Sequence, residues 1–448
     1  MVRVVGTCLF LLLAGLTPVA GGSPASAQGP DPSYAVNAER ALRAGKYPSP
    51  ITKLTTAPGP RPGQATLKWK SEGRRTDFFR LETSLTPAPA GKKGRSFTTF
   101  KITKRASKVR AGLFKYTLSS RQTKKAGAAL GTANYLHVRL YAVNKTRTKR
   151  FERRWPPLET VGIAGRAPTG SGSDLRVGDW NVRLDVTNGD TAQDLADHPW
   201  SKRAELVADQ VVALQPGVVG LQAVLPRMVG DLNQHLPGYY RLTRETAYNN
   251  SPGIARILYD NRRFETVDDC TTSDGPNCKL TLDGGNVIPL ARLRDLATLE
   301  EFWVVTAHLT VGKGKEELRE RQTEQIVAWA QERRTAEPGV PIIFTGDINS
   351  QQRSTEGHLP HRALIRGGFY DSAAAVRQVR LQYATVNHYA TPERPDPLGF
   401  GPRLDVIMML GMTGASRFEI VLSKGGSSTR GTDYPSDHNF IYADLKLP

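Results

Sequence analysis

The C-terminal part of the chain, from residue 175 onward, alternates strand-like and helix-like segments, and this alternation limits its possible folds more than any other feature. Apolar, β-branched runs typical of buried strands include LRVGDWNV, PGVVGLQAV, EFWVVTAHLT and VPIIFTGDINS. Between them, residues 198–215 and 318–334 have apolar residues at helical spacing. Interleaved strands and helices favour a layered α/β architecture.

Polar side chains follow or close these apolar runs, where a sheet can present polar groups to a shared cleft. Taken singly, each could have a structural role, such as capping a turn or satisfying a buried hydrogen bond. Their joint occurrence at the ends of separate strands indicates a functional site instead. The residues concerned are Asn181, Gln222, His308, Asp347, Asn349, Asp405, Asp437 and His438.

The chemistry that fits this set is the hydrolysis of phosphoric esters. Carboxylate and amide oxygens suit a hard cation such as Mg²⁺, which can neutralise charge on a scissile phosphate and its leaving oxygen. A histidine with an acidic neighbour can activate water or stabilise a pentacoordinate phosphorus. Asp437 and His438 are adjacent, and Asp405 is expected to orient that histidine. Asp347 and Asn349, two residues apart, can project into one cleft.

Six motifs occur in the order typical of one family. VGDWNV, VVGLQ, TAHL, GDINS, RLDVI and SDHN resemble the motifs of the endonuclease/exonuclease/phosphatase superfamily, over residues 175–448. The resemblance implies a four-layer α/β sandwich of two packed, mostly antiparallel sheets flanked by helices.

The same resemblance implies the residues that carry out catalysis. His308 matches the first catalytic histidine, and Asp405 with His438 matches the acid–histidine dyad. Asp347 and Asn349 match the pair that aligns the nucleophile and holds the phosphate.

The ligands of one divalent cation, Mg²⁺, Mn²⁺ or Ca²⁺, are implied in the same way. Asn181 and Asp437 match metal or phosphate ligands, and Gln222 is expected to bind the phosphate.

One position departs from the family pattern. The second motif normally ends Gln-Glu, with the glutamate as a principal metal ligand, whereas this chain has Gln222 and Ala223. Losing an anionic ligand weakens the binding of a hard cation. The cation could bind weakly through Asp437, Asn181 and substrate oxygens, or Asp179, on the same strand face as Asn181, could replace the glutamate. In a third explanation the domain has lost most turnover and binds phosphate esters.

Residues 1–27 have the features of a secretory signal peptide. A basic residue, Arg3, precedes an apolar centre from Leu9 to Leu16, and small residues precede the expected cleavage after Ala27. No later run is apolar for long enough to cross a bilayer. The mature protein is therefore expected to be secreted, without a transmembrane anchor, and to begin with a short segment at 28–47.

An oxidising destination also bears on the cysteines. Cys270 and Cys278 flank the polar turn CTTSDGPNC, and we expect a disulfide between them. A metal site is the alternative, but no further Cys or His lies nearby in the sequence.

The basic residues are concentrated in one part of the chain. Residues 46–164 contain 27 Lys and Arg against 5 Asp and Glu, a net charge of +22, whereas the whole chain carries +19. Such a field attracts polyanions with a strong dependence on salt. A solvated surface that keeps an exported domain soluble is the alternative.

The same part of the chain, residues 48–164, is expected to form a β-sandwich. Short strand-like runs such as ATLKWKS and ANYLHVRLYAVN lie between turns. Trp69 and the run that begins at Tyr135 resemble the early-strand tryptophan and the tyrosine-corner strand of a fibronectin type III domain. A Gly/Ser/Pro linker at 165–174 is expected to follow.

These features predict a secreted, metal-dependent phosphodiesterase. An endonuclease is the leading hypothesis, because the basic region would hold nucleic acid, or another extracellular polyanion, near the site. A weakly active or inactive protein that binds polyanions or phosphate esters is the first alternative. Sphingomyelinase-like or inositol-phosphate phosphatase activity is the second.

Overall fold

The computed structural model describes residues 47–84, 97–126, 128, 135–146, 150–154, 159–163, 172–185, 198–243, 247–248, 251–252, 254–268, 277–352, 354, 357–389, 393–396, 400–412, 414–422 and 434–447. The predicted signal peptide and most of the predicted segment at 28–47 and of the linker lie outside them. Pro48–Pro448 form one compact unit. Among the described residues, no helix combines the length and apolarity that a membrane span requires.

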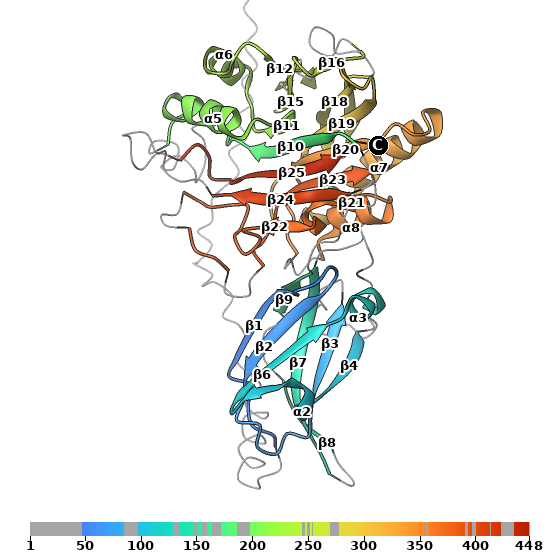
Figure 1. Ribbon diagram of the computed structural model, residues 1–448. Helices are drawn as coiled ribbons and strands as arrows, with labels where there is room; N and C mark the ends of the chain where they lie inside the picture. The colour runs from blue at the N-terminus through green and yellow to red at the C-terminus, as the bar shows by residue number, and fades with distance from the viewer. Residues whose placement is uncertain are drawn as a thin grey trace, which may run out of the picture. The chain divides into compact units, whose positions relative to one another are not determined.

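The first strands of this unit form two antiparallel sheets (Figure 1). One sheet has the order β1-β2-β6-β5, with β1 at Lys53–Pro58, β2 at Ala65–Lys70, β5 at Lys108–Arg110 and β6 at Leu113–Leu118. The other has the order β4-β3-β7-β8 with β9 also pairing to β7; its strands are β3 at Phe78–Ser84, β4 at Thr98–Thr103, β7 at Tyr135–Lys145, β8 at Arg150–Arg154 and β9 at Glu159–Gly162. Two short helices, α2 at Lys104–Ser107 and α3 at Ser120–Lys125, join strands.

An apolar core fills the space between these two sheets. The alternation in β2 buries Trp69 and leaves Lys68 exposed. Trp69 stacks on Phe114 with 5.9 Å between ring centroids and meets Phe79 of the opposite sheet edge-on at 4.9 Å. The two packed sheets fit the expected β-sandwich, while the resemblance to a fibronectin type III domain stays a prediction.

Tyr135, at the start of β7, makes a contact among the described residues that differs from that of a tyrosine corner. A tyrosine corner bonds to backbone a few residues upstream, but this hydroxyl shares a 2.7 Å hydrogen bond with Nδ1 of His358. The ring packs in the core cluster that contains Leu175 and Phe400. Because the side chain is buried there, its one hydroxyl pairs with the polar group that burial brings to it.

Residues 174–447 contain two seven-stranded sheets. The first has the order β12-β15-β11-β10-β25-β24-β22, with bounds β10 Asp174–Asn181, β11 Val218–Gln222, β12 Tyr240–Leu242, β15 Ala255–Asp260, β22 Arg377–Val379, β24 Ala415–Val421 and β25 Phe440–Lys446. The second has the order β16-β18-β19-β20-β23-β21 with β17 pairing to β18; its bounds are β16 Phe264–Thr266, β17 Lys279–Leu282, β18 Asn286–Asp295, β19 Glu301–His308, β20 Ile342–Asp347, β21 Tyr370–Asp371 and β23 Asp405–Leu410. A separate two-stranded sheet is formed by β13 at Ala247–Tyr248 and β14 at Ser251–Pro252.

Most neighbouring strands are antiparallel. The parallel pairs are β10 with β11, β19 with β20, and β22 with β24. Each of the first two lies at the middle of its sheet. This arrangement is the mostly antiparallel pair of sheets that the sequence predicts.

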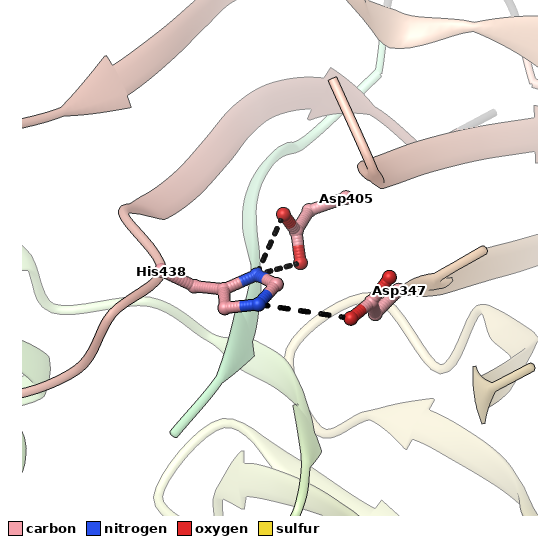
Figure 2. A group of neighbouring side chains, drawn as sticks. All are labelled: Asp347, Asp405 and His438. Atoms are coloured by element: carbon pink, nitrogen blue, oxygen red, sulfur yellow. Dashed lines mark hydrogen bonds and ion pairs between the residues drawn. The ribbon is translucent and has the colours of Figure 1, made fainter. Parts of the chain in front are cut away.

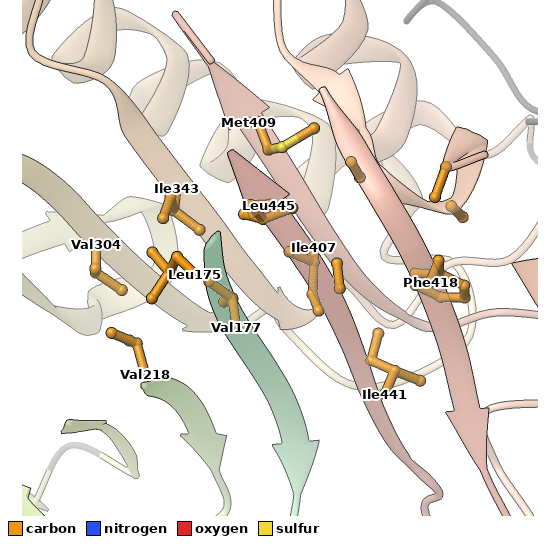
Figure 3. Packing of buried hydrophobic residues seen from close by; sticks show 14 of the residues in the cluster. Leu175, Val177, Val218, Val304, Ile343, Ile407, Met409, Phe418, Ile441 and Leu445 are labelled. Carbon is orange, nitrogen blue, oxygen red and sulfur yellow. The ribbon is translucent and has the colours of Figure 1, made fainter. Parts of the chain in front are cut away.

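The two large sheets pack face to face, and helices cover their outer faces. The core between them takes Val177 and Val218 from the first sheet and Val304, Ile343 and Ile407 from the second (Figure 3). Helices α5 at Trp200–Leu214 and α6 at Pro226–His235 pack on the first sheet, and α7 at Glu316–Ala336 and α8 at Leu359–Arg366 on the second. Short 3-10 turns occur at Asp283–Gly285 and Ser372–Ala374. The predicted four-layer α/β sandwich is confirmed.

Several boundaries differ from the predicted ones. β10 begins at Asp174, one residue inside the predicted linker. α7 begins at Glu316, two residues before the predicted helix, and this buried carboxylate accepts hydrogen bonds from Ser350 Oγ and the Leu359 amide. The short helices α6 and α8 were not predicted, because they carry only two or three turns of periodic pattern.

The predicted disulfide falls partly outside the described residues. Cys278 is buried and disulfide-bonded. Cys270 is not described, so the pairing of these two cysteines stays a prediction.

Candidate active site

The candidate site lies where the central strands of the two sheets end. Asn181 and Gln222 end the parallel strands β10 and β11 and pair in register. His308 and Asp347 likewise end the parallel strands β19 and β20 and pair with each other. Parallel strands present their carboxyl ends at one edge, so each sheet delivers two polar side chains to its edge.

A dyad and a third acid form the centre of the site (Figure 2). Asp405 begins β23 opposite Asp347, and both its carboxylate oxygens lie 3.0 to 3.1 Å from Nδ1 of His438. Nε2 of the same ring lies 3.8 Å from Oδ2 of Asp347. Asp405 therefore fixes the orientation of the imidazole and turns Nε2 toward Asp347.

Asp347 joins the residues of the two sheets. Its Oδ2 accepts a 3.0 Å hydrogen bond from Nδ2 of Asn181, on the other sheet, and lies 3.6 Å from Nε2 of His308. Its Oδ1 accepts from the backbone amide of Asn349 at 2.9 Å. The structure thus brings Asn181, His308, Asp347, Asp405 and His438 together.

The electrostatics of this group assign charges at neutral pH. Burial opposes the charge on His438, but the carboxylates of Asp405, Asp347 and Asp437 together outweigh burial and raise the pKa of His438 to about 10. Burial also opposes the charge on Asp347, but His308 and His438 lower the pKa of Asp347. Burial lowers the pKa of His308. The site therefore holds a cationic His438, an anionic Asp347 and a neutral His308.

Three further predicted residues, Asn349, Gln222 and Asp179, lie in hydrogen bonds within the protein. Nδ2 of Asn349 donates to the backbone oxygen of Leu309 at 3.0 Å, so its amide ties two loops together. Nε2 of Gln222 donates to Oδ1 of Asp179 at 2.7 Å and to Oγ1 of Thr306 at 2.9 Å. The side chains of Gln222 and Asp179 meet between the sheets. Oδ2 of Asp179 has no hydrogen-bond partner among the described residues.

Asp179 is a poor replacement for the missing glutamate in this arrangement. The side chain is fully buried, and burial, followed by the nearby Asp405, raises the pKa of Asp179 well above its ordinary value. A carboxyl group that is neutral is a weak cation ligand. The structure therefore disfavours the explanation that Asp179 supplies the lost charge.

Asp437 has a cationic partner within the chain. Nη1 of Arg183, two residues after Asn181, donates to Oδ2 of Asp437, and the aspartate side chain is 7% exposed. Asp437 is close enough to the histidines to favour the charged forms of both His308 and His438. The acid next to His438 is therefore neutralised by an arginine.

Comparisons with known proteins identify the fold. No family model matches the chain. A solved endonuclease/exonuclease/phosphatase family protein from Bacteroides thetaiotaomicron matches 62% of this chain and 96% of its own, with a TM-score of 0.50 and 19% identity. The chain therefore has the endonuclease/exonuclease/phosphatase fold. A mannosyl-6-phosphatase from the same organism matches 60% of the chain with a TM-score of 0.47.

Curated relatives match part of their length. Human nocturnin is 24% identical over 262 residues, which cover 54% of this chain and 58% of that protein. Mouse nocturnin is 23% identical over 224 residues, which cover 47% of this chain and 50% of that protein. The chain thus spans about half the length of the curated relatives it matches.

The endonuclease/exonuclease/phosphatase fold implies a divalent cation, and the donors present fit such an ion only in part. Ligand atoms of Asp347, Asp405 and His438 lie within 4.8 Å of one another and could hold a metal ion. Both oxygens of Asp405, however, face His438. At the implied ligand positions, Ala223 offers no oxygen, and Asp437 is paired with Arg183. These donors do not fit a tightly held cation.

Sequence reasoning missed two arginines in this fold. Arg183 directly follows the first motif and was not singled out, and Arg203, on α5, is buried. Arg203 donates to four backbone oxygens, those of Val182, Arg183, His198 and Pro435. It thereby holds the loops that carry Arg183 and Asp437. The one available signal was an arginine on the apolar face of a predicted helix.

Proposed function

We propose that residues 175–448 hydrolyse phosphoric esters, and specifically the phosphodiester bonds of nucleic acid. The observation that carries the proposal is the arrangement around Asp347. An acid–histidine dyad, a second histidine and an asparagine from the opposite sheet converge on this one carboxylate. The chemistry of this set suits attack of water on phosphorus.

In the proposed mechanism Asp347 and His438 have different roles because they carry opposite charges. The water oxygen bonds to phosphorus while the ionised Asp347 takes its proton. Because His438 is cationic at neutral pH, it is not the base, and its Nε2–H stabilises the growing charge on the phosphoryl oxygens. The neutral His308 and Asn181 orient Asp347 and the phosphate. The ester oxygen departs as its bond to phosphorus breaks and takes up a proton from solvent water.

The predicted cation, Mg²⁺ with Mn²⁺ or Ca²⁺ as alternatives, remains part of this proposal. Asn181 and Asp437 would hold it at one weak site, and when bound it would supply charge to the phosphate. Binding should be weak because position 223 is alanine, so the third oxygen ligand that the family resemblance implies, besides Asn181 and Asp437, is missing.

Nucleic acid is proposed as the substrate because of the basic residues at 46–164. A net charge of +22 would concentrate a polyanion next to the site. The proposed secretion, which rests on the signal-like residues 1–27, would make that polyanion an extracellular one.

A cleavage assay tests the proposal. The full chain is incubated with plasmid DNA, with Mg²⁺, Mn²⁺, Ca²⁺ or EDTA, beside His438→Ala and beside His235→Ala, an exposed histidine on α6. We expect nicking that His438→Ala lowers about 10²–10⁴-fold and that His235→Ala leaves unchanged. Equal nicking by all three proteins would contradict the proposed site.

A second candidate is binding without turnover, favoured by Ala223 at the implied glutamate position. A salt-sensitive gel shift without cleavage in any metal would support this candidate. Parallel assays with sphingomyelin and an inositol phosphate test the remaining hydrolase alternatives.

A further inference from the structure

Arg183 is held in a fixed position beside the proposed site. It follows β10 in the left-handed backbone region, with φ of 64°. Its amide donates to Oδ1 of Asn181 at 3.0 Å, and its backbone oxygen accepts from Nη2 of Arg203 at 3.2 Å. These contacts fix the backbone from which the Arg183 side chain leaves, in the same segment that carries Asn181.

The guanidinium of Arg183 lies at the acid that the family resemblance assigns to the cation. It donates to Oδ2 of Asp437, while Oδ1 of that acid has Ser436 Oγ at 3.4 Å. The arginine side chain is 22% exposed and the aspartate 7%. The pair is thus mostly withdrawn from water, where a charge–charge contact is screened little.

Neither of the two acidic positions expected around a divalent cation therefore presents an unpaired carboxylate. Position 223 carries a methyl group, and Asp437 is already neutralised by the guanidinium. A divalent ion that used Asp437 would have to displace Arg183 and leave that charge partly buried and unpaired, which is costly. The absence of an acid at position 223 and the pairing of Asp437 with Arg183 both disfavour a divalent cation at this site.

We propose that Arg183 is a resident cation of the phosphate site: it pairs with Asp437 in place of a divalent ion and supplies the positive charge that attracts a bound phosphoric ester. A planar guanidinium suits phosphate oxygens, and it carries its charge at any physiological pH. The inference rests on the proposed phosphoric ester site. It adds that the ester binds without a divalent cation, and that Arg183 and the cation compete for one acid.

Two binding measurements on the full chain test the competition. Calorimetry measures the affinity for inorganic phosphate and for dimethyl phosphate in EDTA, and electron paramagnetic resonance measures the affinity for Mn²⁺ alone. The variants are Arg183→Gln, Arg183→Lys and, as a matched control, Arg227→Gln, an arginine that is 59% exposed and pairs with Asp185.

We expect the unaltered chain to bind both phosphates in EDTA. Arg183→Gln should raise the Kd for phosphate at least about tenfold and lower the Kd for Mn²⁺ about fivefold or more, because Asp437 is released. The two Kd values of Arg183→Lys should lie between those of the unaltered chain and those of Arg183→Gln. A lysine supplies the charge but not the planar geometry of a guanidinium. Arg227→Gln should change neither constant.

Asp437→Asn keeps the test decisive if Arg183→Gln does not fold. This variant should keep phosphate binding in EDTA, because Arg183 remains, and should lose Mn²⁺ binding. Loss of phosphate binding by folded Asp437→Asn would overturn the inference, and so would unchanged phosphate binding by folded Arg183→Gln.

The outcome for the unaltered chain separates this inference from the proposed function. Phosphate binding that requires Mn²⁺ would overturn the role of Arg183 and leave the proposed hydrolase intact. Absence of phosphate binding both in EDTA and with Mn²⁺ would overturn the phosphoric ester site and the inference together.

Discussion

His438 is the residue whose charge depends most clearly on its neighbours. Its pKa is raised to about 10 from an ordinary value of 6.5, because Asp405, Asp347 and Asp437 together outweigh burial. A group with a raised folded-state pKa stabilises the folded protein fully below its unfolded pKa, and that contribution disappears as the pH rises through the folded pKa. The contribution of His438 is therefore complete below about pH 6.5 and is lost toward pH 10.

This linkage gives a stability prediction. The free energy of unfolding of the unaltered chain should exceed that of His438→Gln by more at pH 6 than at pH 10. Urea unfolding at both pH values measures the difference. A difference that is equal at the two pH values would show that His438 is not charged in the folded protein.

Removing the acid of the dyad should lower the pKa of His438. In Asp405→Asn burial remains and the Asp405 carboxylate is gone, while Asp347 and Asp437 still favour the charged ring, so a smaller fraction of the imidazole should be charged at pH 7. We expect hydrolysis at pH 7 to fall about 10²–10⁴-fold. Its alkaline limit should move to lower pH, as read from the pH–rate profile. Asp209→Asn, an exposed acid on α5, is the control and should leave the profile unchanged.

Restoring an acid at position 223 should strengthen cation binding. Ala223 is buried beside the site, so a longer side chain there has to enter packed space. Ala223→Glu should lower the Kd for Mn²⁺ and raise metal-dependent hydrolysis, because it adds an anionic ligand, at a cost of about 1–3 kcal/mol in stability. No gain in Mn²⁺ affinity, in a variant shown by circular dichroism to be folded, would refute the view that this position limits the cation site.

At the scale of elements, the spacing of the two central sheets depends on a glycine in β11. A Cβ at Gly220 would lie 1.9 Å from Oγ1 of Thr345 and 2.5 Å from Oγ1 of Thr306, both on the opposite sheet. Gln222 and Asp179 meet in the same space. The strands that carry the site can approach this closely only because position 220 has no side chain.

Gly220→Ala should therefore destabilise the protein by about 1–3 kcal/mol, since the added methyl group overpacks the core. The matched control is Gly230→Ala in α6, where a Cβ would meet no atom within 4 Å. That change should stabilise the helix by about 0.5–1 kcal/mol. Thermal unfolding compares the two variants, and equal shifts in Tm would contradict this account of the sheet spacing.

At the scale of the whole molecule, the charge is divided between two parts of the chain. The basic excess lies at 46–164, and exposed lysines of the described strands there include Lys101, Lys108 and Lys115. If this region holds nucleic acid, each phosphate contact contributes about 0.9 to the slope of log Kobs against log[salt].

Replacing these three lysines with glutamine should lower the slope for DNA binding by up to about 3. The control replaces three exposed basic residues outside the region, Lys202, Arg227 and Arg241. Fluorescence anisotropy at several salt concentrations measures both slopes. An equal or larger loss in the control would place the DNA contact on residues 175–448 instead.

The sequence alone determined the elements and the residues at their ends. Periodicity is a local property, so the strands ending at Asn181, His308 and Asp347, the helices α5 and α7 and the layered α/β architecture could be predicted from it. The resemblance extended this prediction to the four-layer order of the sheets. Short helices such as α6, with few periodic positions, could not be predicted in this way.

Only the tertiary structure decided which of these residues are partners. Arg183 and Asp437 are separated by 254 positions, and Asn181 and Asp347 by 166. Whether an acid has a water, a cation or an arginine beside it depends on how the sheets pack, because burial and proximity set charge. For the same reason Asp179, which shares a strand face with Asn181, is buried against Gln222, and Asp437 is neutralised by a base that the motif did not single out.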